Sequence, residues 1–215
     1  MNRRSFLTTV AAGTGTALTV SLAGCNALQS SALEDLDEVQ PDRQLPVPTL
    51  GDGDVTVDVY EDLGCPACHQ FQAEVFPVLA EEYIESDEIS YRHYDFPVGA
   101  ADESVGMANA ARAVQSETHD GEDDPNGQFF GYKSAVIASD DWSDDALAEL
   151  AGVVDVDPDV VSSALEDETY YPTIVADRER GEEAGVEGTP TVIVDGTIVD
   201  DPLDSDAVVS SIESA

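Results

Sequence analysis

Apolar and polar residues alternate near position 55, and this pattern predicts the first strand of the chain. Residues 55–60 read Val-Thr-Val-Asp-Val-Tyr, as expected for a strand with one buried face. A second strand is expected over residues 89–95, where Pro97 ends it. Between them apolar residues recur at helical spacing and predict a helix that begins at or near Cys65: Phe71, Val75, Val78, Leu79 and Tyr83. Pro77 is expected to kink this helix, because its ring removes one backbone donor.

The rest of the pattern is helical up to about residue 185 and then changes to a hairpin. An alanine-rich stretch over residues 103–117 and an apolar stretch over 128–138 predict two helices. Ser143 and Asp157-Pro158 are typical of helix starts, and a last long helix is expected over 173–184. Residues 191–199 place Asp195-Gly196 between two apolar runs, which predicts a β-hairpin.

The first 24 residues differ in composition from everything that follows. They contain no acidic residue, whereas all 46 Asp and Glu lie in residues 25–215, and such a break marks a processing segment. Arg3-Arg4, followed by Phe-Leu, matches the twin-arginine export pattern. Leu22-Ala23-Gly24-Cys25 is similar to a lipobox, so we expect residues 1–24 to be a signal peptide and Cys25 to carry lipid. In the alternative interpretation Cys25 is only a small residue of the apolar signal.

Residues 25–50 are predicted to be a flexible tether between a membrane and the folded body. Polar residues alternate there with Pro41, Pro46 and Pro48, which favour extended backbone. A short helical turn over residues 32–39 is compatible with the pattern. Residues 51–215 are then the folded body.

The charge of the chain is extreme. Eight Lys and Arg oppose 46 Asp and Glu, which gives a formal net charge of −38, and Lys133 is the only lysine. No basic stripe exists that could bind nucleic acid. A hydrophobic fraction of 42% is nevertheless sufficient for a core. Because molar salt screens the repulsion within such an acidic surface, the composition resembles that of proteins from extreme halophiles.

The main candidate for chemistry is the sequence Cys65-Pro66-Ala67-Cys68 at the strand-to-helix junction. Unpaired N–H groups and the macrodipole at a helix N-terminus favour an anion, and the thiolate is the form of cysteine that attacks disulfides. Cys68 lies one turn further on and can close a ring with Cys65. Pro66 suits the first turn and stiffens it.

Three other interpretations of the cysteine pair are open. A structural disulfide would close only a tiny loop and stabilise little. A zinc site would need further ligands, and no second cysteine pair exists. With His69 the motif reads C-x-x-C-H, the pattern for attaching c-type haem, in which His69 would be one axial ligand. The candidates for the other ligand are Met107, His93 and His119, although nothing in that chemistry needs the buried strand just upstream.

The body resembles the DsbA-like thioredoxin-fold oxidoreductases over residues 53–213. The similarity is carried by Tyr-Glu-Asp-Leu-Gly-Cys-Pro-Ala-Cys-His-Gln-Phe at 60–71, Tyr-Arg-His-Tyr-Asp-Phe-Pro at 91–97 and Gly-Val-Glu-Gly-Thr-Pro-Thr at 185–191. It implies an α/β thioredoxin-like fold with a helical insertion, about 100–185, between an N-terminal βαβ part and a C-terminal ββα part. It also implies that Cys65 attacks, Cys68 resolves and Thr189-Pro190 is a cis-proline wall facing them, with Thr189 and Pro66 next to the substrate. No cofactor and no metal are expected.

The chain departs from this family at the group that handles the proton. Many members place an acid six residues before the first cysteine, but here that residue is Val59. The nearest acids are Asp58, Glu61 and Asp62, and the candidates for proton transfer are Asp62 and His69. His69 could stabilise the Cys65 thiolate, although a position facing solvent is the simpler interpretation for it. Alanine at 67 also replaces the histidine of the strongest oxidants in the family.

Together these features predict a thiol–disulfide oxidoreductase outside the cell, anchored to the outer face of the membrane through Cys25. Its expected partners are the thiols or disulfides of exported proteins and, by analogy, a membrane redox protein. A dithiol oxidase is the first hypothesis. An extracytoplasmic reductase, a haem c electron carrier and an inactive thioredoxin-like scaffold are the alternatives.

Overall fold

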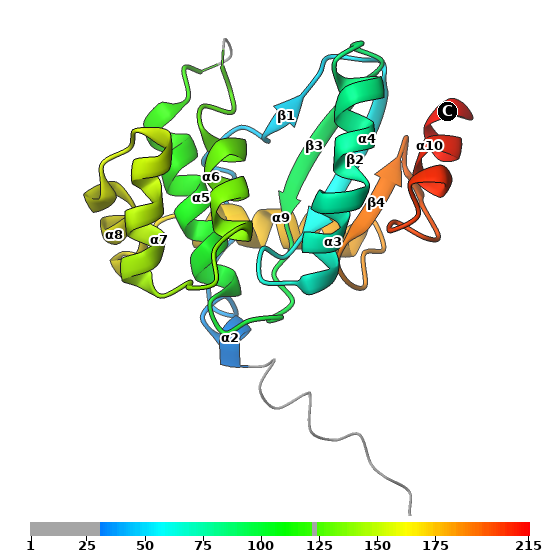
Figure 1. Ribbon diagram of the computed structural model, residues 1–215. Helices are drawn as coiled ribbons and strands as arrows, with labels where there is room; N and C mark the ends of the chain where they lie inside the picture. Colours follow the sequence, from blue (N-terminus) through cyan, green and yellow to red (C-terminus); the bar gives the residue numbers. More distant parts are fainter. Residues whose placement is uncertain (1–30, 122–123) are drawn as a thin grey trace, which may run out of the picture.

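In the computed structural model, which describes residues 31–121 and 124–215, five strands form one mixed sheet in the order β1-β3-β2-β4-β5 (Figure 1). The central strand β2, Val55–Glu61, runs parallel to β3, Ile89–Asp95, and antiparallel to β4, Thr191–Val194. The edges are β1, Thr49–Leu50, and β5, Thr197–Ile198, both antiparallel to their neighbours. The two predicted strands and the hairpin are therefore confirmed.

Alternation along β2 separates the two faces of the sheet. Val57 and Val59 lie on one face. They share a core with residues of α3 (Pro66–Glu74), α4 (Phe76–Leu79) and the C-terminal helix α10 (Ser205–Glu213). Tyr60 belongs to the other face, which the long helix α9, Tyr171–Glu183, crosses. A Cβ on Gly181 of α9 would come within 2.8 Å of Phe96, so glycine is required for this close packing.

The helix after β2 is interrupted as the sequence predicted. Helix α3, Pro66–Glu74, is followed by Val75, then α4, Phe76–Leu79, and a π-turn, Ala80–Ile84. Pro77 has no N–H to donate to the carbonyl four residues earlier, so the regular ladder breaks at this point.

Residues 104–183 form the helical insertion beside the sheet. Its helices are α5, Ser104–Thr118; α6, Phe129–Ile137; α7, Asp144–Leu150; a 3₁₀ turn, Ala151–Val154; α8, Pro158–Glu166; and α9. Asp157 caps α8 through its side chain, which accepts from the amide of Asp159. Ser143 occupies the N-cap position of α7 but makes no side-chain capping bond. The predicted thioredoxin-like fold with a helical insertion is confirmed.

The described part of the predicted tether is packed against the body instead of extending from it. A short helix α2, Ser31–Glu34, is followed by a turn in which Leu36 is buried and by a segment in which Leu45 is buried. Arg43 forms an ion pair with Asp177 of α9, and β1 adds to the edge of β3. Residues 31–50 are thus part of the fold, because their few apolar side chains find partners there that composition alone could not indicate.

The predicted signal and lipid site, Arg3, Arg4 and Cys25, lie outside the described residues. Within residues 31–121 and 124–215, no helix has the length and apolar character needed to cross a membrane.

Candidate active site

The two cysteines lie where β2 gives way to α3. Cys65 is the N-cap residue of α3, with Pro66 in the first turn behind it. Its carbonyl accepts from the amide of His69 at 3.0 Å, and its own amide donates to Asp62 O. Both thiols are free, so the structure describes the dithiol state. Cys65 is 8% exposed and Cys68 is 1% exposed, so that only Cys65 reaches the surface.

The environment makes the two sulfurs chemically unequal. A hydrogen bond from the Cys68 side chain is the largest influence on Cys65, and with the backbone amides of Cys68 and Ala67 it outweighs partial burial. The pKa of Cys65 is therefore lowered to about 5. Burial raises the pKa of Cys68 far above the ordinary thiol range. At neutral pH Cys65 is a thiolate and Cys68 is a protonated thiol.

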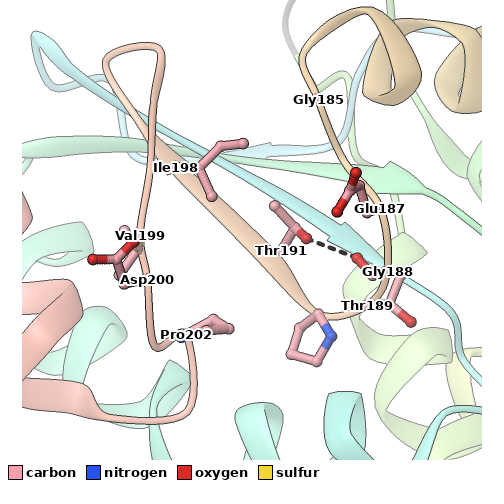
Figure 2. A pocket seen from close by; sticks show the side chains of 10 residues that line it. Gly185, Glu187, Gly188, Thr189, Thr191, Ile198, Val199, Asp200 and Pro202 are labelled. Carbon is pink, nitrogen blue, oxygen red and sulfur yellow. Dashed lines mark hydrogen bonds between the residues drawn. The ribbon is translucent and has the colours of Figure 1, made fainter.

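The predicted wall opposite the cysteines is present. The Thr189-Pro190 peptide bond is cis, and Cys65 Sγ lies 3.6 Å from the carbonyl oxygen of Thr189. The hydroxyl of Thr191, the first residue of β4, donates to the carbonyl oxygen of Gly188 at 2.7 Å (Figure 2). This hydrogen bond connects the two ends of the cis-proline loop.

A groove of about 440 Å³ lies along this loop and the hairpin that follows it. Its lining mixes apolar and acidic side chains, among them Pro190, Ile198, Pro202, Glu187 and Asp200 (Figure 2). Thr189, whose carbonyl oxygen lies 3.6 Å from Cys65 Sγ, is among the residues that line this groove.

Asp62 does not occupy a proton-transfer position. One carboxylate oxygen accepts from the amide of Gly64 at 2.8 Å, and the other accepts from the amides of Val98 and Ala100 at 2.9 and 3.2 Å. Its role is to fix the loop before Cys65 against the loop after β3. This arrangement disagrees with the sequence-based assignment of proton transfer to Asp62.

Glu61, the last residue of β2, is the acid that the structure brings to the buried cysteine. Its side chain is buried, and its charge contributes to the raised pKa of Cys68. It accepts from Lys133 and from Gln72, the latter at 2.9 Å, and lies 3.1 Å from His93. Burial alone would raise the pKa of Glu61, but Lys133 and His93 outweigh it and lower the pKa to about 2.

Sequence reasoning named Glu61 only as one of three nearby acids and missed its partner. The available signal was that the one lysine of a chain with 46 acids falls in a helix rich in apolar residues. Lys133 is 2% exposed, so this cation does not belong to the surface.

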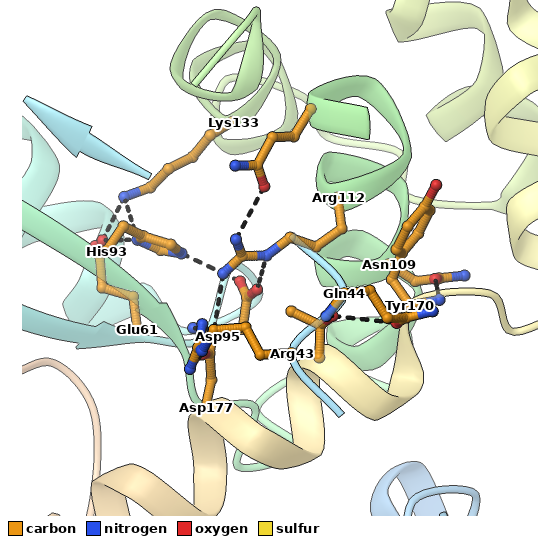
Figure 3. Close-up of polar contacts among 12 residues, drawn as sticks. Arg43, Gln44, Glu61, His93, Asp95, Asn109, Arg112, Lys133, Tyr170 and Asp177 are labelled. Atoms are coloured by element: carbon orange, nitrogen blue, oxygen red, sulfur yellow. Dashed lines mark hydrogen bonds and ion pairs between the residues drawn. The ribbon is translucent and has the colours of Figure 1, made fainter. Parts of the chain in front are cut away.

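Buried charges continue from Glu61 across the sheet to α9 and the N-terminal segment (Figure 3). His93 lies between Glu61 and Asp95. Arg112 of α5 then joins Asp95 to Asp177 at 2.6 and 2.7 Å, and Arg43 closes the series at Asp177. These contacts hold the insertion and residues 31–50 against the sheet.

His69 is half-buried, which corrects the interpretation that it faces solvent. Its Nε2 lies 2.6 Å from the carbonyl oxygen of Leu63, to which it donates, and its ring stands edge-on to Trp142 of the insertion. The residue therefore ties α3 to the loop before Cys65 and to the insertion.

The contacts of the other candidate haem ligands disfavour that alternative. Met107 is fully buried in the core of the insertion, and both ring nitrogens of His93 contact charged side chains. His119 accepts from the amide of Gly121 in a loop. Over the described ranges, no group of three or more His, Cys, Asp or Glu side chains is arranged to hold a metal ion.

A thioredoxin-like sheet with a reactive dithiol at a helix N-terminus, opposite a cis-proline loop, defines a thiol–disulfide oxidoreductase. The chain belongs to the family described as thioredoxin, whose match covers residues 50–214. Its sequence is 27% identical over 164 residues to the probable disulfide bond formation protein D of Bacillus cereus, covering 73% of this chain and 74% of that one. It is 23% identical over 170 residues to disulfide bond formation protein D of Bacillus subtilis, covering 77% and 75%.

Solved structures show the same fold. Oxidised BdbD from Bacillus subtilis superposes with a TM-score of 0.69 at 21% identity, covering 82% of this chain and 97% of that chain. DsbA from Chlamydia trachomatis gives a TM-score of 0.70 at 19% identity, covering 82% and 95%. The resemblance to DsbA-like oxidoreductases is confirmed.

Proposed function

We propose that this oxidoreductase is a dithiol oxidase that forms disulfides in exported proteins outside the cell. The observation that carries the proposal is the inequality of the two sulfurs, with the pKa of Cys65 lowered to about 5 and that of buried Cys68 raised. A stabilised thiolate favours the reduced enzyme, and this makes the disulfide form a stronger oxidant.

The reaction begins when a client thiolate attacks Sγ of Cys65 in the oxidised enzyme. The Cys65–Cys68 bond breaks, and Cys68 leaves as a thiolate that takes up a proton. The second thiolate of the client then attacks the client sulfur of the mixed disulfide. The client gains a disulfide, Cys65 leaves as a thiolate, and the enzyme has accepted two electrons.

Client binding is assigned to the surface around Cys65. The carbonyl of Thr189, 3.6 Å from the sulfur, and the groove beside Pro190 are open to an extended segment. Pro66, an exposed residue next to Cys65, forms the other side. Cys65, Cys68, Thr189, Pro190 and Pro66 are accordingly our proposed site residues.

The location is proposed from the N-terminal sequence. Export through Arg3-Arg4 and lipid attachment at Cys25 would leave the body on the outer face of the membrane. There a membrane redox partner could take the two electrons from the dithiol. Replacing Cys25 by Ser should move the protein from the membrane fraction to the medium, and unchanged membrane association would contradict the anchor.

The test of the activity uses the purified chain in molar KCl. At this salt concentration the repulsion between the acidic side chains, which give the chain a net charge of −38, is largely screened. Wild-type enzyme should oxidise a dithiol peptide. Cys65→Ser and Cys68→Ser should each abolish the reaction, because neither variant can form the Cys65–Cys68 disulfide. Cys68→Ser should still form a mixed disulfide through Cys65 when it is offered a peptide disulfide, whereas Cys65→Ser should not. Turnover by Cys65→Ser would refute the mechanism.

The direction of the reaction is tested by the reduction potential of the Cys65–Cys68 pair. A potential well above that of the client disulfide supports the oxidase, since about 30 mV corresponds to tenfold in the equilibrium. A potential below it would instead support the reductase.

A further inference from the structure

The N-terminal segment of the described chain enters the fold at the end of the sheet that carries the active site. Strand β1 is antiparallel to β3, so the residues before Thr49 run alongside β3 towards its C-terminal end. Arg43 of this segment pairs with Asp177, whose other carboxylate oxygen accepts from the amide of Asp95, the last residue of β3. Because β2 and β3 are parallel, this is also the end at which β2 leads to Cys65.

Helix α2 and the turn after it lie next to the active-site loop, with the start of α5 between them. Leu36 belongs to the same apolar cluster as Val105, in the first turn of α5. The preceding residue, Ser104, lies against Gly64, where an added Cβ would come within 2.9 Å of the Ser104 hydroxyl oxygen. Gly64 directly precedes Cys65. Figure 1 accordingly shows α2 at the same end of the molecule as the start of α3.

The link between this entry point and the proposed lipid site is short. Five residues lie between Cys25 and Ser31, the first residue of α2. Even a fully extended backbone of this length spans at most roughly 20 Å. The seven residues of β2 alone measure roughly 23 Å, and the chain continues beyond both ends of this strand. The link is therefore too short for the body to turn over and point its Cys65 end away from the bilayer.

The surface around α2 opposes close contact with an anionic bilayer. Glu34, Asp35, Asp37 and Glu38 are all exposed there, and residues 25–42 contain no Lys or Arg. These carboxylates are repelled by anionic headgroups, although molar salt shortens the range of the repulsion to about 3 Å. The anchor thus holds this end near the bilayer while the charges keep it from adhering, which leaves room for a loop of a membrane protein.

We propose that the anchor turns the Cys65 end of the body towards the membrane, where the surface around Cys65 docks a membrane protein that carries a reactive disulfide close to the bilayer. The proposal rests on the lipid attachment and the exchange reaction proposed above. The Cys65 thiolate attacks the partner disulfide, and one partner sulfur leaves as a thiolate. Cys68 then loses its proton to solvent and attacks Cys65 Sγ, which expels the second partner thiolate. The enzyme regains its disulfide, and the partner has accepted two electrons.

The first experiment compares the two ends of the body. Lipidated protein is purified from membranes and bound, in molar KCl, to vesicles whose headgroups carry an energy-transfer acceptor. A donor dye is attached through iodoacetamide to Cys65, or to position 52 in the double variant Cys65→Ser, Asp52→Cys. Residue 52 is exposed and precedes the N-terminal end of β2, so it marks the opposite end of the strand. Transfer should be greater from Cys65, and equal or greater transfer from position 52 would overturn the proposal.

The second experiment measures the reaction with a disulfide at the bilayer surface. The probe is a pyridyl disulfide attached to phosphatidylethanolamine in vesicles, and release of pyridine-2-thione reports the attack of Cys65. A variant with about 40 Gly and Ser residues inserted after Ser30 keeps the same body on a much longer, flexible link. Because effective concentration falls roughly as the −3/2 power of link length, the insertion should slow this reaction by about 20-fold.

A dissolved pyridyl disulfide is the matched control, and both proteins should react with it at equal rates because the insertion lies outside the body. Equal rates of the two proteins with the lipid-borne disulfide would overturn the proposal and leave the exchange function intact. If wild type reacted with neither disulfide, the exchange function and the proposal that rests on it would both be refuted. If wild type did not bind the vesicles, the anchor would be refuted and the orientation with it.

Discussion

Lys133 of α6 forms a buried ion pair with Glu61 at the end of β2, and this pair joins the helical insertion to the strand that leads into the active-site helix. The two residues are 72 positions apart in the sequence. Because Glu61 also adds to the raised pKa of Cys68, Lys133 of the insertion is connected to the buried thiol through Glu61. The insertion therefore supplies the cation that compensates the buried acid next to the active-site helix.

Alkylation should distinguish the two cysteines by pH. The rate at which iodoacetamide modifies the dithiol enzyme is expected to rise with a midpoint near pH 5, because the thiolate is the reactive form and the pKa of Cys65 is lowered to about 5. In Cys65→Ser the remaining Cys68 should react slowly up to at least neutral pH, because burial raises its pKa. A midpoint in the ordinary thiol range, about 8.5, would contradict the assignment.

Removal of Lys133 should destabilise the protein strongly. Lys133→Met leaves the buried carboxylate of Glu61 without its cation, and such a loss costs about 3–5 kcal/mol. The double variant Lys133→Met with Glu61→Gln should recover a large part of this loss, because no uncompensated charge remains. Urea unfolding in molar KCl measures the free energies, and equal stabilities of the single and double variants would disagree with a coupled pair.

The Lys133–Glu61 pair should make the free energy of unfolding depend on pH in the acidic range. The pKa of Glu61 in the folded protein, about 2, lies below its ordinary value of 4.5, so the ionised carboxylate stabilises the fold above pH 4.5. This contribution is lost as the pH falls from 4.5 towards 2, and its full size is about 3 kcal/mol. Glu61→Gln should lack this part of the acid dependence. Parallel stability curves for wild type and Glu61→Gln over that range would contradict the shift.

The packing of the N-terminal segment can be tested at Arg43. Its partner Asp177 is fully buried, so Arg43→Ala removes one of the two cations that compensate a buried carboxylate, at a cost of about 1–3 kcal/mol. Arg180→Ala is the control: its side chain is 48% exposed and lies 3.5 Å from Asp58, which keeps its closer ion pair with Arg92, so a loss of about 1 kcal/mol or less is expected. A smaller loss for Arg43→Ala than for Arg180→Ala, measured by urea unfolding, would show that the segment is not held there.

The sequence by itself determined strands β2 and β3, the interrupted helix, the hairpin and the position of the two cysteines. These features depend on local patterns: alternation along β2, the proline at 77, the Asp195-Gly196 turn and the helix N-terminus at Cys65. Residues close together in the sequence determine these features, so the sequence is sufficient to predict them. The asymmetry expected of the two thiols follows from the same local geometry, since backbone amides next to Cys65 contribute to its low pKa.

Only the tertiary structure decided which charges meet behind the thiols. Asp62 and Glu61 are adjacent in sequence, yet one accepts from three amides and the other from Lys133 and Gln72. Likewise, residues 31–50 have the composition of a linker but pack through Leu36, Leu45 and Arg43. Burial and long-range pairing determine the energy of a charge in a protein, and neither quantity is a property of the residues adjacent in sequence.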